Sequence, residues 1–308
     1  MKNLRRYMLL FLKGLSMGTA DVIPSISSGT IALITGIYSE LLDTIHSFNK
    51  IAFKLLLAGK WQRFWKQIHG NFLLPLGLGI TVSLLTTVRL VRYLLDQYPI
   101  EVSSFFFGLS IISAMVIYQQ LKKINVLTLL MSILGAFLAY LLIQTTPLAS
   151  PSATWFIFIS GALATCAMIL PGISGSFILL ILGKYTFMLE ALEKFDWYIL
   201  TIFMSGGLLG LLIFSKSLSF LLHTYTNYTI GLLAGFMMGA IPKTWPWKSF
   251  MPAVSKIPTS MLLEKNISPI HFQAIYHKDP HILQALLCMS LGCLVVILLN
   301  KLGNRKQV

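Results

Sequence analysis

Residues 14–38 read GLSMGTADVIPSISSGTIALITGIY, and residues 161–185 read GALATCAMILPGISGSFILLILGKY. Aligned without gaps, the two copies share ten identical residues. In the numbering of the first copy these are Gly14, Ala20, Pro24, Ile26, Ser27, Ile31, Leu33, Ile34, Gly36 and Tyr38. Each copy is apolar on both sides of a short centre rich in Pro, Ser and Gly, a composition that interrupts helices. A duplicated apolar segment with such a break is typical of the binding sites of membrane transporters.

The composition places the chain in a lipid bilayer. Of its 308 residues, 56% are hydrophobic and only 11% are charged. The 24 Lys and Arg outnumber the 10 Asp and Glu, but they are scattered between apolar runs, so we expect no nucleic-acid partner. Cys166, Cys288 and Cys293 lie inside apolar runs and are odd in number, so we expect no disulfide, metal site or cofactor.

The first twenty residues imitate a secretory signal peptide. Basic residues at Lys2, Arg5 and Arg6 precede an apolar stretch, and residues 18–20 resemble a cleavage site. Lys13 interrupts that stretch, and cleavage would destroy the first copy of the repeat. We therefore interpret the segment as retained.

Six apolar runs predict membrane-spanning helices, since a span needs about 20 such residues. They are residues 72–95, 103–121, 126–144, 198–222, 228–241 and 283–299. The likeness continues beyond the motifs, because Gly108-Leu109 echoes Gly231-Leu232 and Leu134-Gly135 echoes Leu291-Gly292. We expect an all-α integral membrane protein built from one repeat that covers nearly the whole chain.

The two halves, residues 1–148 and 149–308, are predicted to insert with opposite orientations. Two short arms that meet at a helix break suggest a re-entrant hairpin near 14–38 and another near 161–185, and two full crossings at each place are the alternative. Either arrangement contributes an even number of crossings, so three further spans make each total odd. The second half is then upside down relative to the first, as in inverted-repeat transporters.

The loop charges indicate that the N-terminus lies inside the cell. The short loops 96–102 and 145–154, which this orientation places outside, contain no Lys or Arg. The 242–282 loop also falls outside and carries five lysines, but long loops are weak topology signals. Residues 41–69 combine apolar residues at helical spacing with basic residues and two tryptophans. They predict a helix on the cytoplasmic leaflet, attracted to anionic membrane lipids; a basic connector explains them equally well.

The helix breaks are candidate anion sites. Pro followed by Ser or Gly starts a helix well, and the N–H groups and positive end of such a helix attract anions. The candidate substrate-binding residues are Ser25, Ser27, Ser28, Gly29 and Thr30 in the first copy and Gly172, Ser174, Gly175 and Ser176 in the second, with Pro24 and Pro171 as the breaks. Small residues also serve close helix packing, but duplication of the break favours binding of a phosphate or carboxylate.

Four charged residues complete the candidate site. Asp21 lies three residues before Pro24, where a charge in a membrane is costly, so we expect it to carry a proton, to organise the broken helix ends, or to serve only as a structural cap. It is our first candidate for proton coupling, with Glu40 second. Arg89 and Lys216 lie late in their spans, where they can meet an anionic headgroup.

These residues resemble a known family. Gly14-x-x-x-Gly18-x-Ala20-Asp21-x-Ile23-Pro24-x-x-Ser27-x-Gly29-Thr30, Gly36-Ile37-Tyr38, residues 167–176, Phe214-Ser215-Lys216 and Trp245-Pro246 are similar to the bacterial polyprenyl-phosphate transporter family, formerly a domain of unknown function. Ser25 and Ser28 stand where that family usually has Gly. The resemblance covers about residues 10–300. It implies a multi-pass protein of the bacterial cell membrane that returns undecaprenyl phosphate to the inner leaflet for cell-wall synthesis.

Two other functions compete with this one. A membrane lipid phosphatase needs a nucleophilic His with a second His and an Arg cluster, and none of the six histidines lies in a motif, so we expect no catalytic residues. An anion channel or small-anion exchanger is the stronger alternative, because broken helices lined by Ser, Gly and Pro suit inorganic anions as well as lipid headgroups.

Overall fold

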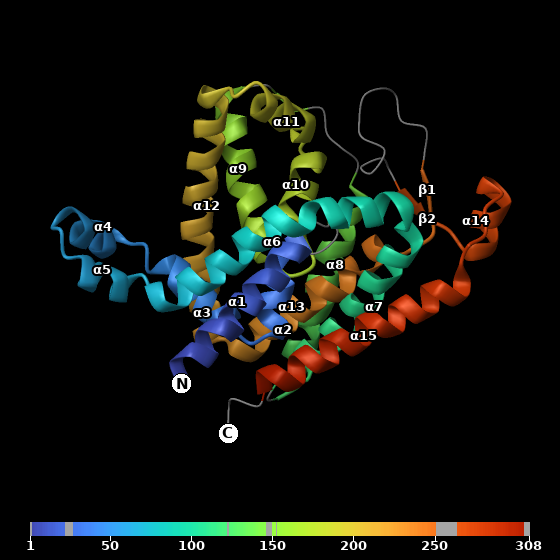
Figure 1. Ribbon diagram of the computed structural model, residues 1–308, viewed down its shortest axis with the longest axis horizontal. Coiled ribbons are helices and arrows are strands. Elements are labelled where there is room, and N and C mark those ends of the chain that lie inside the picture. The colour runs from blue at the N-terminus through green and yellow to red at the C-terminus, as the bar shows by residue number, and fades with distance from the viewer. Residues whose placement is uncertain are drawn as a thin grey trace.

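The structure, a computed structural model, describes residues 2–21, 27–121, 123–145, 150–151, 153–250 and 264–304 (Figure 1). The first half contains α1 (Lys2–Asp21), α2 (Ser28–Ile34), α3 (Tyr38–His46), α4 (Lys50–Leu57), α5 (Trp61–Gln67), α6 (Gly70–Gln97), α7 (Pro99–Tyr118) and α8 (Val126–Gln144). The second contains α9 (Thr154–Ile169), α10 (Gly175–Ile181), α11 (Tyr185–Glu193), α12 (Trp197–Thr224), α13 (Thr226–Ala240), the 3₁₀ turn η1 (Ile241–Thr244), β1 (Lys248–Phe250), β2 (Glu264–Asn266), α14 (Pro269–Tyr276) and α15 (Ile282–Asn304). The two strands pair antiparallel, with Lys248 opposite Asn266.

Five described helices are long and apolar enough to cross a membrane, namely α6, α7, α8, α12 and α15. The number becomes six if α10 and α11, which are bent by 112° at their junction, count as one span. The prediction of a helical, multi-pass membrane protein is therefore confirmed. The predicted span at 228–241 becomes α13, whose 15 residues rise only about 22 Å and fall short of the roughly 30 Å hydrocarbon core.

Local sequence fixes where several of these helices begin. Asn125 precedes α8, and its side-chain oxygen accepts a hydrogen bond from the Thr128 N–H at 2.8 Å. Asp196 caps α12 in the same way through the Ile199 N–H at 3.2 Å. Each cap satisfies an N–H group that has no partner within its helix. Pro99 occupies the first turn of α7, where its missing N–H costs nothing.

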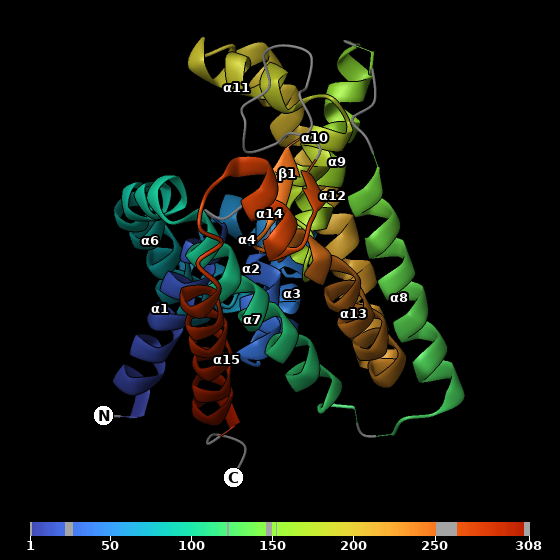
Figure 2. The ribbon, with the colours of Figure 1, turned by 90° about the vertical axis from the view of Figure 1, so that its right-hand side faces the viewer.

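The long helices associate as four pairs (Figure 2). In the first half α1 packs along α6, and in the second half α9 packs along α12 in the corresponding way. The other two pairs join the halves, because α7 packs on α15 and α13 packs on α8. The halves are therefore interlocked rather than stacked as two separate bundles.

Glycines allow these close crossings, and they occupy matched positions in the two halves. A Cβ on Gly292 of α15, the counterpart of Gly135, would overlap the Phe105 carbonyl oxygen of α7. A Cβ on Gly135 of α8 would overlap the Leu232 carbonyl oxygen of α13. Small residues at helix crossings are the usual means of tight association in membranes. The glycines that echo each other in the sequence thus serve equivalent crossings.

Residues 41–69 form short helices rather than the single helix that their periodicity predicts. Asn49 ends the turn after α3, and its side chain accepts hydrogen bonds from the N–H groups of Ile51 and Ala52 to start α4. Gly59, with a φ of 65°, then separates α4 from α5. The resulting α4–α5 pair projects from one end of the molecule, and α14 lies at the opposite end (Figure 1).

Alanine substitutions at two glycines of α6 test the packing of α6 against α1. A Cβ on Gly79 of α6 would overlap the Phe11 carbonyl oxygen of α1, whereas a Cβ on Gly77 would have no heavy atom within 4 Å. We expect Gly79→Ala to cost about 1–3 kcal/mol of stability through overpacking. Gly77→Ala should leave stability unchanged or raise it by up to about 1 kcal/mol through helix propensity. Thermal unfolding of both purified variants in one detergent measures this, and equal unfolding temperatures would contradict the α1–α6 packing.

Candidate functional site

The two repeat motifs meet in the interior of the molecule. The start of α2, from the first motif, lies against the end of α9 and the adjoining break in the second motif. Ser27 and Thr30 are both buried, with 2% and 3% of their surface exposed. Segments about 140 residues apart in the sequence thus form one polar centre inside an apolar protein.

The first break is closed by its own side chains. The Asp21 carboxylate, at the end of α1, accepts a hydrogen bond from the Ser28 N–H at 2.9 Å. The Ser27 hydroxyl oxygen accepts one from the Gly29 N–H at 3.1 Å. Two of the N–H groups that begin α2 are therefore satisfied, and the carboxylate lies at the helix end that favours negative charge.

The first motif also satisfies the exposed carbonyl groups where α9 ends. Because α9 stops at Ile169, its last carbonyl oxygens have no partner within the helix. The Ser27 hydroxyl donates to the Met168 carbonyl oxygen at 2.6 Å, and the buried Tyr38 hydroxyl donates to the Ile169 carbonyl oxygen at 3.0 Å. A Cβ on Gly29 would overlap that same oxygen, so only Gly allows the two segments to approach this closely.

Gly172 provides a reciprocal contact from the second motif. Its N–H donates to the Thr30 hydroxyl oxygen at 3.1 Å, and its φ of 88° is in the region that favours glycine. Gly175 begins α10 so close to α9 that a Cβ would lie 2.6 Å from the Ala164 carbonyl oxygen. Both glycines therefore have packing roles in addition to any role in binding.

The second break differs from the first in its polar groups. The hydroxyls of Ser174 and Ser176 lie 2.7 Å apart, both residues are partly exposed, and Ser174 makes no capping hydrogen bond. The counterpart of Asp21 is Met168, which is 43% exposed. The second copy thus offers hydroxyl groups without an adjacent carboxylate, whereas the first copy is occupied by its own Asp21.

The remaining predicted residues lie away from this centre or outside the described residues. Pro24 and Ser25 fall in the second category. Arg89 on α6 and Lys216 on α12 are exposed and form no hydrogen bond or ion pair with the described residues of either break. Glu40 is half exposed and pairs with Arg6, whose Nη2 lies 2.9 Å from its Oε1. Roles for Arg89, Lys216 and Glu40 in binding or coupling stay predictions.

Sequence reasoning missed a polar cluster that joins α3 to α12. The Asp43 carboxylate accepts a hydrogen bond from the Ser219 hydroxyl at 2.5 Å and lies 3.7 Å from Nε2 of His223. The signal was present, because Asp43 is one of only ten acids in the chain and lies in its amphipathic stretch. Sequence reasoning also missed Lys184, which is 5% exposed and lies between the rings of Phe156 and Phe187. Within the described part of the chain, no three His, Cys, Asp or Glu side chains gather as metal ligands.

Comparisons with known proteins give this geometry a context. Residues 17–260 match the protein family described as VCA0040-like, undecaprenyl phosphate translocase-like. A protein from Vibrio cholerae named polyprenyl-phosphate transporter is 40% identical over 304 residues, which cover 97% of this chain and 98% of the relative. A protein of the same name from Staphylococcus aureus is 33% identical over 254 residues, covering 76% of this chain and 85% of the relative. No solved structure matches the chain.

Proposed function

We propose, because the chain belongs to the undecaprenyl phosphate translocase-like family, that it carries polyprenyl phosphate between the leaflets of the bacterial cell membrane. The observation that carries this proposal is 40% identity with a polyprenyl-phosphate transporter over nearly the full length of both chains. Both relatives are named transporters rather than enzymes. Return of the lipid from the outer to the inner leaflet would recycle it for cell-envelope synthesis.

The phosphate headgroup is proposed to bind where the two motifs meet, with the prenyl tail left in lipid. The hydroxyls of Ser174 and Ser176 are partly exposed and can donate to phosphate oxygens. The first motif adds the Ser28 side chain, which is also partly exposed. Thr30 and Gly172 hold the two breaks together, so that donors from both halves stay within one site.

The two halves are proposed to be inverted repeats, each with a re-entrant hairpin. The matched order of helices and the matched glycine crossings support a repeat of residues 1–148 in 149–308. The start of α1 and the end of α15 lie at the same end of the molecule, which agrees with two halves that each cross the membrane an odd number of times (Figures 1 and 2). Alternating access is then achieved by rocking one helix group against the other around the headgroup.

Proton coupling is proposed because of the electrical cost of the substrate. Moving one negative charge into a cell at 100 mV, inside negative, costs about 2.3 kcal/mol. Binding a proton with the phosphate removes that cost. Asp21 is the acid that contacts a helix break directly, through Ser28, whereas Glu40 is paired with Arg6 near the surface.

The first prediction concerns the hydroxyl donors. We expect Ser174→Ala combined with Ser176→Ala to lower the rate of lipid-phosphate transport at least about tenfold, because two hydrogen bonds to a charged group are worth about 1.5–3 kcal/mol each. The matched control is Ser205→Ala with Ser217→Ala, whose exposed hydroxyls on α12 bond only to their own helix. Movement of labelled undecaprenyl phosphate in reconstituted vesicles measures both. Faster flux of inorganic anions than of the lipid in the unsubstituted protein would support a small-anion exchanger instead.

Membrane sidedness of two exposed positions tests the inverted repeat. In a chain without Cys166, Cys288 and Cys293, we expect Ser39→Cys to react with an impermeant thiol reagent from the cytoplasmic side only. Lys194→Cys, directly after α11, which is the second-half counterpart of α3, should react only from the outside. Both side chains are exposed, so accessibility does not limit the reaction. Reaction of both positions from one side would show that the halves have the same orientation.

The substitution Asp21→Asn separates a role in proton coupling from a role in capping α2. Asn retains a side-chain oxygen for the Ser28 N–H but cannot exchange a proton, so we expect Asp21→Asn to fold normally and to lose the pH-gradient dependence of transport. Glu40→Gln should keep that dependence. The measurement is lipid-phosphate flux in vesicles with imposed pH and voltage gradients. A wild-type response in Asp21→Asn would exclude Asp21 as the coupling acid.

A further inference from the structure

The two halves differ most in the segment that comes after their third helix. In the second half, α11 reaches α12 through residues 194–196, whereas residues 47–69 separate α3 from α6 in the first half. This insertion contains α4 and α5, which pack on each other and project beyond the helix pairs (Figure 1). Because the second half has no counterpart of α4 and α5 among its described residues, this insertion gives one end of the molecule a surface that the other half lacks.

The insertion carries an apolar surface suited to a membrane. Its large exposed side chains are Phe48, Ile51, Phe53, Leu57, Trp61 and Trp65, with exposures between 39% and 72%. Tryptophan is enriched where a protein meets the headgroup region of a bilayer, and short amphipathic helices rest there on their apolar faces. The α4–α5 pair is thus built to lie against lipid headgroups.

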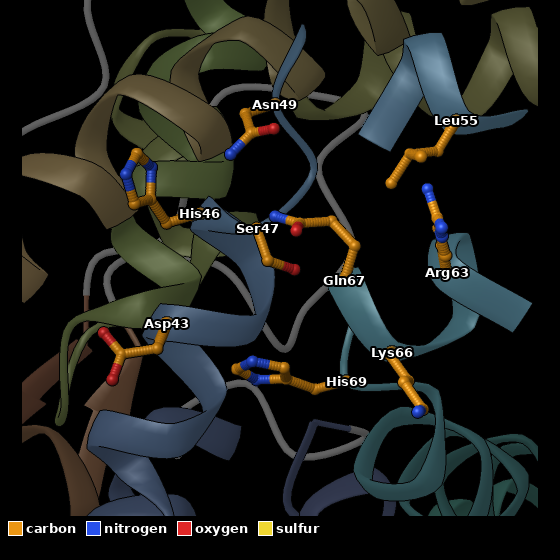
Figure 3. Close-up of a pocket in the computed structure, with 9 residues that line it drawn as sticks. All are labelled: Asp43, His46, Ser47, Asn49, Leu55, Arg63, Lys66, Gln67 and His69. Atoms are coloured by element: carbon orange, nitrogen blue, oxygen red, sulfur yellow. The ribbon is translucent and has the colours of Figure 1, made fainter. Parts of the chain in front are cut away.

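A polar pocket of about 510 Å³ opens beside this surface (Figure 3). Side chains from α5, among them Arg63 and Lys66, stand on one side of it, and those at the end of α3 and just beyond it stand on the other. The full lining is Asp43, His46, Ser47, Asn49, Leu55, Arg63, Lys66, Gln67 and His69. The pocket therefore combines two permanent cations, Arg63 and Lys66, with one carboxylate, Asp43, and with other hydrogen-bonding groups.

The two permanent cations of this pocket form no ion pair with any described side chain. None of the Asp and Glu side chains that the structure describes comes within 4.0 Å of Arg63 or Lys66 in an ion pair. The one carboxylate in the lining, Asp43, already accepts from Ser219 and lies beside His223. The pocket is left with net positive charge and unused donors, which is the complement of a phosphate group.

We propose that this pocket binds the phosphate headgroup of an anionic membrane lipid, at a site separate from the two helix breaks. The apolar side chains of α4 and α5 hold the pocket at the membrane surface, and Arg63 with Lys66 supplies the charge. Binding there does not require transport, because none of the residues that line the pocket belongs to the repeated motifs.

Native mass spectrometry of the full-length protein in detergent tests this site with dioctanoyl phosphatidic acid as the probe. The variant Arg63→Ala with Lys66→Ala should bind the probe at least about tenfold more weakly. The matched control is Lys54→Ala with Lys60→Ala, which removes the same charge from exposed positions of the insertion outside the pocket. We expect the control to change affinity less than twofold, and dioctanoyl phosphatidylcholine to bind weakly to all variants.

Three results would overturn the proposal. If the pocket variant and the Lys54→Ala, Lys60→Ala control lose the same affinity for phosphatidic acid, the effect is one of general charge and not of the pocket. Inorganic phosphate that binds as tightly as the lipid would assign the pocket to a soluble anion. Loss of all probe binding in Ser174→Ala with Ser176→Ala, while Arg63→Ala with Lys66→Ala binds normally, would place the only phosphate site at the helix breaks.

Discussion

The fold depends on satisfying the backbone where a helix stops inside a membrane protein. When α9 ends before Pro171, its last carbonyl oxygens lose their helical partners, and lipid offers no replacement. Hydroxyls of Ser27 and Tyr38, from the other half of the chain, take that role by donating to the Met168 and Ile169 carbonyl oxygens. Contact between the two motifs therefore stabilises the end of α9 inside the protein.

This contact gives the repeat two unequal members. In the first break, Asp21 and Ser27 cap α2, so these two polar side chains already have hydrogen-bond partners within the protein. The second break has no carboxylate at the matched position, and its Ser174 and Ser176 are partly exposed. The inserted segments add to the inequality, since residues 47–69 extend one half and residues 241–281 extend the other.

Much of this architecture can be predicted from sequence, because its signals are local. Five of the six predicted spans are recovered within a few residues, and composition alone indicates the Pro-centred break at 171 and the capping role of Ser27. Individual hydrogen-bond partners across the halves could not be predicted, since nothing near Ser27 indicates a hydrogen bond to residue 168. The single helix expected over 41–69 was wrong because Asn49 and Gly59 stop helices more strongly than the apolar periodicity extends them. The roles of Arg89 and Lys216 were inferred from their charge and their late position in a span, and neither specifies a distance to the helix breaks.

The packing of first-half helices on second-half helices also limits when the fold can be completed during synthesis. The crossing of α7 and α15 joins residues 185 positions apart, as in the contact of the Cys293 thiol with the Gly108 carbonyl oxygen. At roughly 5–20 residues per second, synthesis needs about 10–40 s to deliver that partner. During this interval α7 and α8 wait in the bilayer with their glycine faces uncovered, so a ribosome that stops within the second half leaves a product whose first half is unfinished too.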